Sequence, residues 1–190
     1  MKIAKKYIKN IFCLEGDWDK DLRKKSSVRA ALVFMSQVYG VDFIHRHCGT
    51  KAEIEYYLSV WKQKRYEEYS IVYFAFHGEP YNIKVGRRFK MNLDELADIL
   101  ENSCKDKIIH FGSCRTLDIN NEKIRGFLRK TQALCVCGYR SDVEFIESTV
   151  FDLLLLNKFQ DYRDIRCVFR DMKKQYSGMV KSLKFKYVFI

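Results

Sequence analysis

The sequence predicts one α/β domain over residues 1–190, a three-layer α/β/α sandwich with a mostly parallel sheet of about six strands. Short apolar runs alternate with segments whose apolar residues recur at helical spacing. The run Ile71–Phe76 is apolar throughout, which is typical of a parallel strand buried on both faces. The chain has 190 residues, 47% of them hydrophobic and 31% charged, and one proline, so it is long enough for one core and is not of low complexity.

Six apolar runs, each ended by turn-forming or polar residues, are predicted strands. The run ending at Phe76 stops at His77-Gly78-Glu79-Pro80, and the run ending at Phe111 stops at Gly112-Ser113-Cys114. Between them, residues 81–91 are predicted to form a hairpin that turns at Gly86. In chain order, the predicted strands span 10–14, 41–48, 71–76, 107–111, 133–137 and 185–189.

The segments between these strands carry apolar residues three and four positions apart, which predicts helices packed on the sheet. Gly40 is a stop signal for the first of them. Thr50 followed by Glu53 matches a capping box, so a helix is expected to begin there and to reach Trp61. The other predicted helices span 27–38, 92–100, 121–130, 143–159 and 162–179.

Apolar stretches and charge limit the classes of protein that this chain can be. The four-leucine run Leu153–Leu156 and the apolar run Ile71–Phe76 are both far short of the roughly 18 residues of a membrane span. Residues 11–14 are too short for a signal-peptide core, so a cytoplasmic protein without a membrane partner is expected. The net charge is +11, and residues 158–190 carry nine basic and three acidic side chains. Nucleic acid is a possible partner, but a solvated basic face or steering of an acidic protein is favoured.

The seven cysteines are odd in number and follow no framework spacing. In a reducing compartment, six are expected to be buried apolar residues and one a reactive thiol. His45 and His47 should share a strand face that Cys48 does not, and Cys135 and Cys137 lack the spacing of a zinc site. Dinucleotide-binding and P-loop motifs are missing from the sequence. We therefore predict neither a metal nor a cofactor.

Two strand ends carry residues that together could perform chemistry. Sites in open parallel sheets lie outside the carboxyl ends of the strands, where His77 and Cys114 are placed. Neighbouring strands lie about 4.8 Å apart, so the imidazole and the thiol could meet if these strands are adjacent. The thiolate would be the nucleophile, with the imidazole as base and then as acid. The N–H groups of Gly78 and Cys114 could bind the developing oxyanion.

A strand ending in His77-Gly78, then a hairpin, a helix over Asn92–Leu96 and a strand ending in Gly112-Ser113-Cys114, resembles the caspase-like cysteine peptidases. Within them the order is most similar to CHAT domains, whose second strand ends in Ser-Ala-Cys. The resemblance covers roughly residues 41–159 and depends more on the order of the predicted strands and helices than on residue identities. It departs from the CHAT pattern at Ser113, where alanine is usual, and in lacking appended repeat domains.

The resemblance implies that Cys114 is the nucleophile and His77 the general base or acid, with Gly78 and Cys114 as the oxyanion hole. It places the pocket for the residue before the cleaved bond (S1) at Glu15, Asp17 and Asp142, whose acidity implies a basic residue there. It also implies a protein substrate and an activating partner or ligand in a signalling or defence module. The alternatives are an inactive member of the same fold that binds a protein, and a basic nucleic-acid-binding module.

Overall fold

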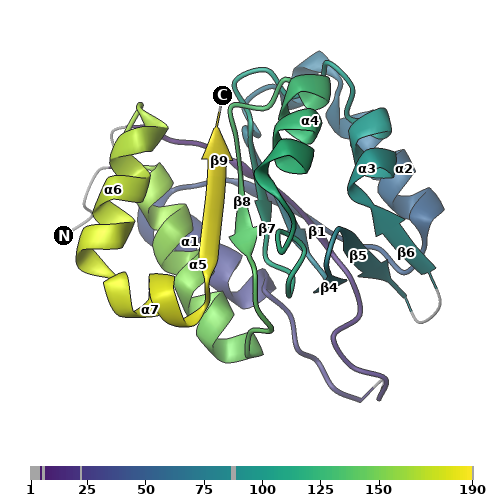
Figure 1. Cartoon of the computed structure of the whole chain (residues 1–190), viewed down its shortest axis with the longest axis horizontal. Helices are drawn as coiled ribbons and strands as arrows, with labels where there is room; N and C mark the ends of the chain where they lie inside the picture. The colour runs from purple at the N-terminus through teal and green to yellow at the C-terminus, as the bar shows by residue number, and fades with distance from the viewer. Residues whose placement is uncertain (1–4, 6, 22, 87–88, 190) are drawn as a thin grey trace.

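The computed structural model describes residues 5, 7–21, 23–86 and 89–189. Helices and strands alternate along the chain as expected of an α/β protein (Figure 1). The strands are β1 (Ile11–Glu15), β2 (Phe43–His47), β3 (Ile71–Ala75), β4 (His77–Glu79), β5 (Asn82–Val85), β6 (Phe89–Asn92), β7 (Ile108–Phe111), β8 (Cys135–Tyr139) and β9 (Phe185–Phe189). The helices are α1 (Arg29–Tyr39), α2 (Lys51–Trp61), the 3-10 turn η1 (Lys64–Tyr66), α3 (Leu93–Ile99), α4 (Asn121–Thr131), α5 (Phe145–Phe159), α6 (Ile165–Gln175) and α7 (Ser177–Ser182).

The main sheet has six strands in the order β2-β1-β3-β7-β8-β9. Neighbouring strands are parallel except for β8 and β9, which are antiparallel. The chain moves from β1 outward to β2 and then back to β3 on the other side of β1. The strand order therefore reverses between β1 and β3, and in open α/β sheets such a reversal marks a crevice for ligands at the carboxyl ends of the strands.

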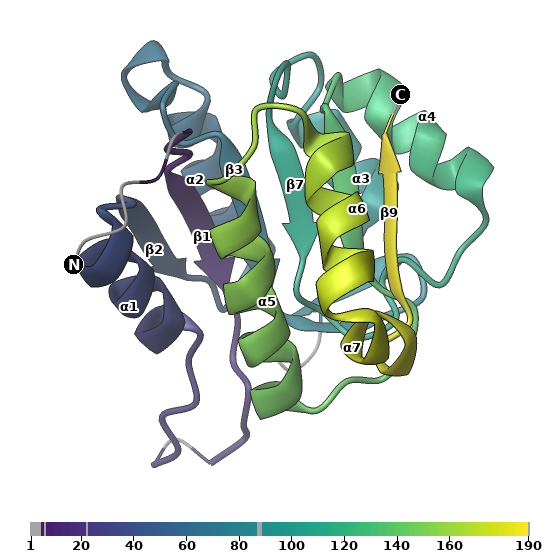
Figure 2. The ribbon, with the colours of Figure 1, turned by 90° about the vertical axis from the view of Figure 1, so that its left-hand side faces the viewer.

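Helices cover both faces of this sheet, so the mostly parallel α/β/α architecture predicted from the sequence is confirmed (Figures 1 and 2). Helices α2, α3 and α4 pack their apolar sides on one face, where Phe74 and Phe111 stack with ring centroids 5.2 Å apart. Helices α1, α5 and α6 cover the other face around Tyr73 and Phe151. Strands β3, β7 and β8 are buried over their whole length, which explains their continuous apolar sequences.

Several local predictions are confirmed. Thr50 and Glu53 form the expected capping box at the start of α2. Gly40 ends α1 in the left-handed conformation, with φ of 70°. Residues 81–91 contain β5 and β6, which pair antiparallel next to Gly86, while residues 87–88 of the turn lie outside the described residues. The hairpin is larger than predicted because β4 pairs with β5 and makes a three-stranded second sheet.

Two predictions were wrong in detail. The helix predicted over 162–179 is two helices, α6 and α7, because Tyr176 leaves the helical conformation with φ of −125° and ψ of 35°. Cys167 on α6 is partly exposed, so five cysteines rather than six are buried apolar residues. Among the described residues, no helix is long and apolar enough to cross a membrane.

Candidate functional site

The candidate site lies at the carboxyl ends of β3 and β7, which are neighbours in the sheet. Phe74 of β3 is in register with Phe111 of β7. His77 lies three residues after Phe74, and Cys114 lies three residues after Phe111. The two segments of the chain therefore leave the sheet side by side. The register therefore places the predicted histidine and cysteine at matching positions on one edge of the sheet.

Gly78 brings the two chain segments into direct contact. A Cβ atom at this position would overlap the carbonyl oxygen of Cys114 and would lie 3.0 Å from the Cβ of Ser113. Thr116 fixes the same turn, because its hydroxyl lies 2.7 Å from that of Ser113 and donates to the Asn82 carbonyl at 3.2 Å. Glycine is thus required for β4 to pass against the turn that carries the cysteine.

The His77 ring is held by the loop that follows β1. Its Nε2 lies 2.9 Å from the Trp18 carbonyl oxygen, and the rings of the two residues meet edge to face at 5.3 Å. A carbonyl oxygen can only accept a hydrogen bond, so Nε2 carries the proton and Nδ1 is free to accept one. Trp18 also packs on Phe145, at the start of α5, with centroids 5.0 Å apart.

Cys114 is partly exposed, and its sulfur faces the loop between β8 and α5. The Val143 N–H donates to Cys114 Sγ at 3.4 Å, and the thiol lies 3.6 Å from the Val143 carbonyl oxygen. Within the part of the chain that the structure describes, no hydrogen bond joins His77 to Cys114, and the Cys114 N–H has no acceptor. The two residues of the predicted dyad therefore share one sheet edge, but their side chains are not hydrogen-bonded to each other in this conformation.

Four of the other thiols lie in buried environments that disfavour the thiolate. Burial raises the pKa of Cys48 and of Cys104 to about 12. The pKa values of Cys13 and Cys137 are also raised well above the ordinary value, chiefly by burial. A thiol must ionise to act as a nucleophile, so these four are poor candidates.

The three carboxylates predicted for the S1 pocket lie in different surroundings. Glu15 is 2% exposed and accepts hydrogen bonds from Ser27 Oγ at 2.6 Å, the Val28 N–H at 2.7 Å and the Trp18 indole, with His45 Nε2 at 2.6 Å. Its four partners saturate the carboxylate, so its direct role is to hold the loop after β1. Burial would raise the pKa of Glu15, but the hydrogen bonds from His45, Ser27, Trp18 and Val28 lower it below the ordinary value.

Asp17 and Asp142 are exposed on this edge. Asp17 lies 3.0 Å from His47 and lines a cavity of about 490 Å³, here called the His77 hollow. Its lining residues are Asp17, Trp18, Asp19, Lys20, His77, Lys84 and Gly86. Asp142 instead precedes Val143, the residue that contacts the Cys114 sulfur. The structure therefore brings Asp17 to the histidine side and Asp142 to the cysteine side.

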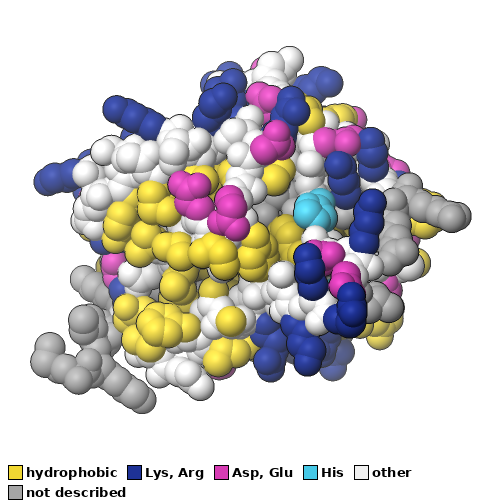
Figure 3. Space-filling view, turned by 90° about the horizontal axis from the view of Figure 1, so that it is seen from below, with side chains coloured by type: hydrophobic (Ala, Val, Ile, Leu, Met, Phe, Trp, Pro, Cys, Tyr) yellow, Lys and Arg dark blue, Asp and Glu magenta, His cyan; other side chains and the backbone are white. Residues whose placement is uncertain are grey.

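Viewed along the strands, this edge carries a band of hydrophobic side chains, with a histidine and several basic and acidic side chains beside it (Figure 3). Sequence reasoning missed Trp18, Asp19 and Val143, which complete the surroundings of the dyad. Trp18 and Asp19 lie in the loop after β1, at the strand-order reversal. They directly follow Asp17, which the sequence did single out, whereas the position of Val143 depends on how the loop before α5 folds back.

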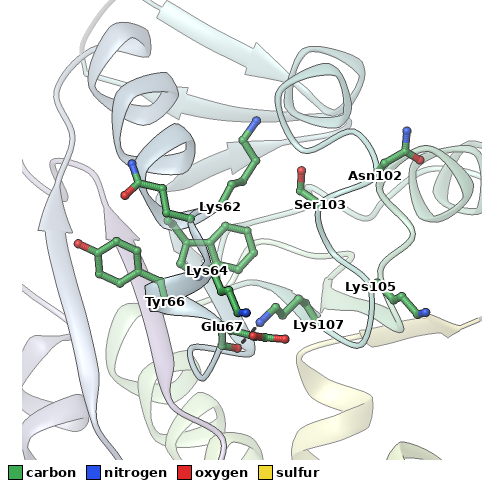
Figure 4. A pocket seen from close by; sticks show the side chains of 10 residues that line it. Lys62, Lys64, Tyr66, Glu67, Asn102, Ser103, Lys105 and Lys107 are labelled. Atoms are coloured by element: carbon green, nitrogen blue, oxygen red, sulfur yellow. Dashed lines mark hydrogen bonds between the residues drawn. The ribbon is translucent and has the colours of Figure 1, made fainter.

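A basic hollow of about 390 Å³ lies at the opposite, amino-terminal edge of the sheet, between η1 and the loop before β7 (Figure 4). Lys62, Lys64, Lys105 and Lys107 line it, together with Glu67. The Lys62 and Lys107 ammonium groups donate to backbone carbonyls, those of Ile99 and Glu67. This amino-edge hollow is separated from the dyad by the length of the strands.

The fold and this edge define a doubly wound α/β protein in which a partly exposed cysteine and an exposed histidine follow the carboxyl ends of neighbouring strands. The chain belongs to a protein family described as "Family of unknown function (DUF6642)", whose model matches residues 8–189. Among curated proteins, no sequence matches the chain.

Proposed function

We propose that this protein is a caspase-like, CHAT-type cysteine endopeptidase in which Cys114 is the nucleophile and His77 the general base. The observation that carries the proposal is the register of β3 and β7, which brings both residues to one sheet edge with Gly78 against the Cys114 turn. The orientation of the imidazole supports it further, because the Trp18 carbonyl leaves Nδ1 available to accept a proton.

The reaction would begin with transfer of the Cys114 thiol proton to His77 Nδ1. The thiolate attacks the carbonyl carbon of the peptide bond, and the negative oxygen is bound by the N–H of Cys114 and that of Gly78. The tetrahedral intermediate collapses as His77 returns the proton to the leaving amine. Water, deprotonated by His77, then releases the acyl group and restores the thiol.

A hydrogen bond between Cys114 and His77 requires the cysteine side chain to turn away from Val143, because its sulfur is hydrogen-bonded to the Val143 backbone. Thermal motion breaks this contact in a fraction of the molecules, and an activating partner or ligand that displaces the 140–144 loop would increase that fraction. Asp17 and Asp19, in the His77 hollow, would favour a basic residue before the cleaved bond. Lys20 and Lys84 line the same hollow and would repel a basic side chain that approaches them. Only a basic side chain that reaches Asp17 and Asp19 would therefore be favoured.

The contact with Val143 also favours a second candidate, an inactive member of the same fold that binds a protein. In that case the sulfur keeps its place against the loop and never gains thiolate character. The two candidates differ in the reactivity of one thiol, which can be measured without a substrate.

We expect Cys114 to react with iodoacetamide faster than the other cysteines near neutral pH, and to slow at least about ten-fold in His77→Ala. Mass spectrometry of each cysteine-containing peptide across a pH series measures these rates. Cys167 is the internal control, because it is also partly exposed but lies on α6. His47→Ala is the matched control, because His47 is an exposed histidine of the same edge. Equal rates for Cys114 and Cys167 in the wild type would favour the binding module.

A further inference from the structure

The carboxyl edge carries a second recess, on the cysteine side of the candidate site. It has a volume of about 640 Å³ and lies between α7, β9 and the loop that precedes α4. We call it the β9 pocket, and its lining residues are Ile119, Asn120, Asn121, Arg140, Val180, Lys181, Lys184, Phe185, Lys186 and Tyr187. Four of these side chains are cationic and none is a carboxylate, which distinguishes it from the His77 hollow and the amino-edge hollow.

The cations of this pocket are only partly neutralised. Arg140 approaches Asp118 at 3.7 Å, but Asp118 also pairs with Arg115 at 3.5 Å. Lys181 and Lys184 are exposed and make no ion pair with any residue that the structure describes. Burial and the charge of Arg140 lower the pKa of Lys186, whose ammonium donates to the Ile119 carbonyl at 2.7 Å. The pocket therefore presents positive charge that an anion would relieve.

Hydrogen bonds connect the pocket directly to the turn that carries Cys114. The Arg115 N–H donates to the Ser141 carbonyl at 3.1 Å, and the Ser141 hydroxyl donates to the Leu183 carbonyl at 3.0 Å. The Arg140 N–H donates to the Lys184 carbonyl at 3.3 Å. The pocket and the Cys114 turn are thus joined by hydrogen bonds through residues 140 and 141, and a ligand bound in the pocket would lie on the Cys114 side of the candidate site.

We propose that the β9 pocket binds acidic side chains of the polypeptide substrate, on the Cys114 side of the cleaved bond. This inference rests on the proposed peptidase function and specifies its substrate class. From β7 across β8 to β9 is two strand spacings, about 10 Å, which an extended peptide covers in about three residues. The preferred substrates therefore carry Asp or Glu about three residues from the cleaved bond, in addition to the basic residue favoured by the His77 hollow.

A single-stranded nucleic acid is the other polyanion that could bind here, and the aromatic residues argue against it. Nucleic-acid grooves use exposed rings on which bases stack. The Tyr187 ring is already stacked on Phe169 at 3.9 Å, and the Phe185 ring packs on Phe151 at 4.9 Å. Carboxylates need only the cations, so a peptide fits the pocket better.

Fluorescence anisotropy of fluorescein-labelled hexaglutamate tests the pocket. We expect Lys181→Glu with Lys184→Glu to weaken binding at least about ten-fold, since both cations become carboxylates. The matched control is Lys64→Glu with Lys105→Glu, the same charge change in the amino-edge hollow, and it should alter binding less than about two-fold. Equal effects of the two double variants would overturn the proposal. Tighter binding of hexauridylate through Lys181 and Lys184 would overturn it in favour of RNA.

Digestion of a peptide library, read by mass spectrometry, tests where the acidic residues lie. Wild-type cleavage should enrich Asp and Glu about three residues from the cut on one side, and the Lys181→Glu with Lys184→Glu variant should lose the enrichment while still cleaving. Cleavage without acidic enrichment would overturn the subsite. If nothing is cleaved, the peptidase proposal and the subsite that rests on it both fail, whereas the hexaglutamate measurement still decides whether the pocket binds acidic peptides.

Discussion

At the scale of single residues, Gly78 shows how closely two segments far apart in the chain can pack when a side chain is missing. The carbonyl oxygen of Cys114 occupies the space that a Cβ would need, and Thr116 Oγ1 lies 2.5 Å from the same point. Both belong to a turn that the Ser113, Thr116 and Asn82 hydrogen bonds fix in place, so they have little room to move. The identity of this residue therefore affects both stability and the position of Cys114.

We expect Gly78→Ala to lower the free energy of unfolding by about 1–3 kcal/mol, because an added methyl group must displace backbone. Urea denaturation measures this change, and the alkylation rate of Cys114 should fall in the same variant. Gly126→Ala is the control, since no atom lies within 4 Å of its added Cβ and it lies inside α4. It should raise stability by up to about 1 kcal/mol. A Gly78→Ala protein as stable as the wild type would contradict the close packing.

At the scale of elements, the loop between β1 and α1 is organised by one buried carboxylate. Glu15 binds Trp18 near the beginning of the loop and Ser27 and Val28 near its end, while His45 holds it from β2. Trp18 in turn holds His77. A residue expected to bind substrate therefore acts by positioning the loop that orients the imidazole.

We expect Glu15→Gln to loosen residues 16–28, because an amide has one oxygen to accept where the carboxylate has two. Limited trypsin digestion should cut faster after Lys24 or Lys25 in this variant. The folded-state pKa of Glu15 is lowered, so its contribution to stability is present above about pH 4.5 and is lost as the pH falls through the folded value. Asp17→Asn, an exposed residue of the same loop, is the control and should leave the digestion rate unchanged.

At the scale of the whole molecule, a buried ionic cluster joins the sheet to α5. His110 Nε2 lies 2.7 Å from Asp152, whose carboxylate also accepts from the hydroxyls of Tyr73, at 2.6 Å, and Tyr139. His110 lies inside the run predicted as a strand over residues 107–111, and its side chain has no exposed surface in the structure. Burial would lower the pKa of His110, but the charge of Asp152 and the contact with Cys137 raise it to about 10.

The proton on His110 should make the stability of the whole molecule depend on pH. The pKa of His110 in the folded protein exceeds the ordinary 6.5. The contribution of the His110–Asp152 pair to the free energy of unfolding is therefore complete below about pH 6.5 and is lost as the pH rises toward about 10. We expect His110→Gln to cost about 3–5 kcal/mol near pH 6, because it leaves a buried carboxylate without its cation. The difference from wild type in urea unfolding should shrink by pH 10. His47→Gln is the exposed control, and a difference that stays constant with pH would contradict this assignment.

The sequence by itself determined the alternation of strands and helices and the two strand ends that carry His77 and Cys114. Hydrophobic periodicity and turn residues are local, so they can be followed along the chain. Only the tertiary structure decided that β3 and β7 are neighbours, that Glu15 is saturated by the protein and that Trp18 holds the histidine. The basic pocket beside Cys114 was likewise beyond the sequence, because it combines Arg140 with lysines more than 40 residues further along the chain. These features depend on which distant segments fold against each other, and local spacing holds no information about that choice.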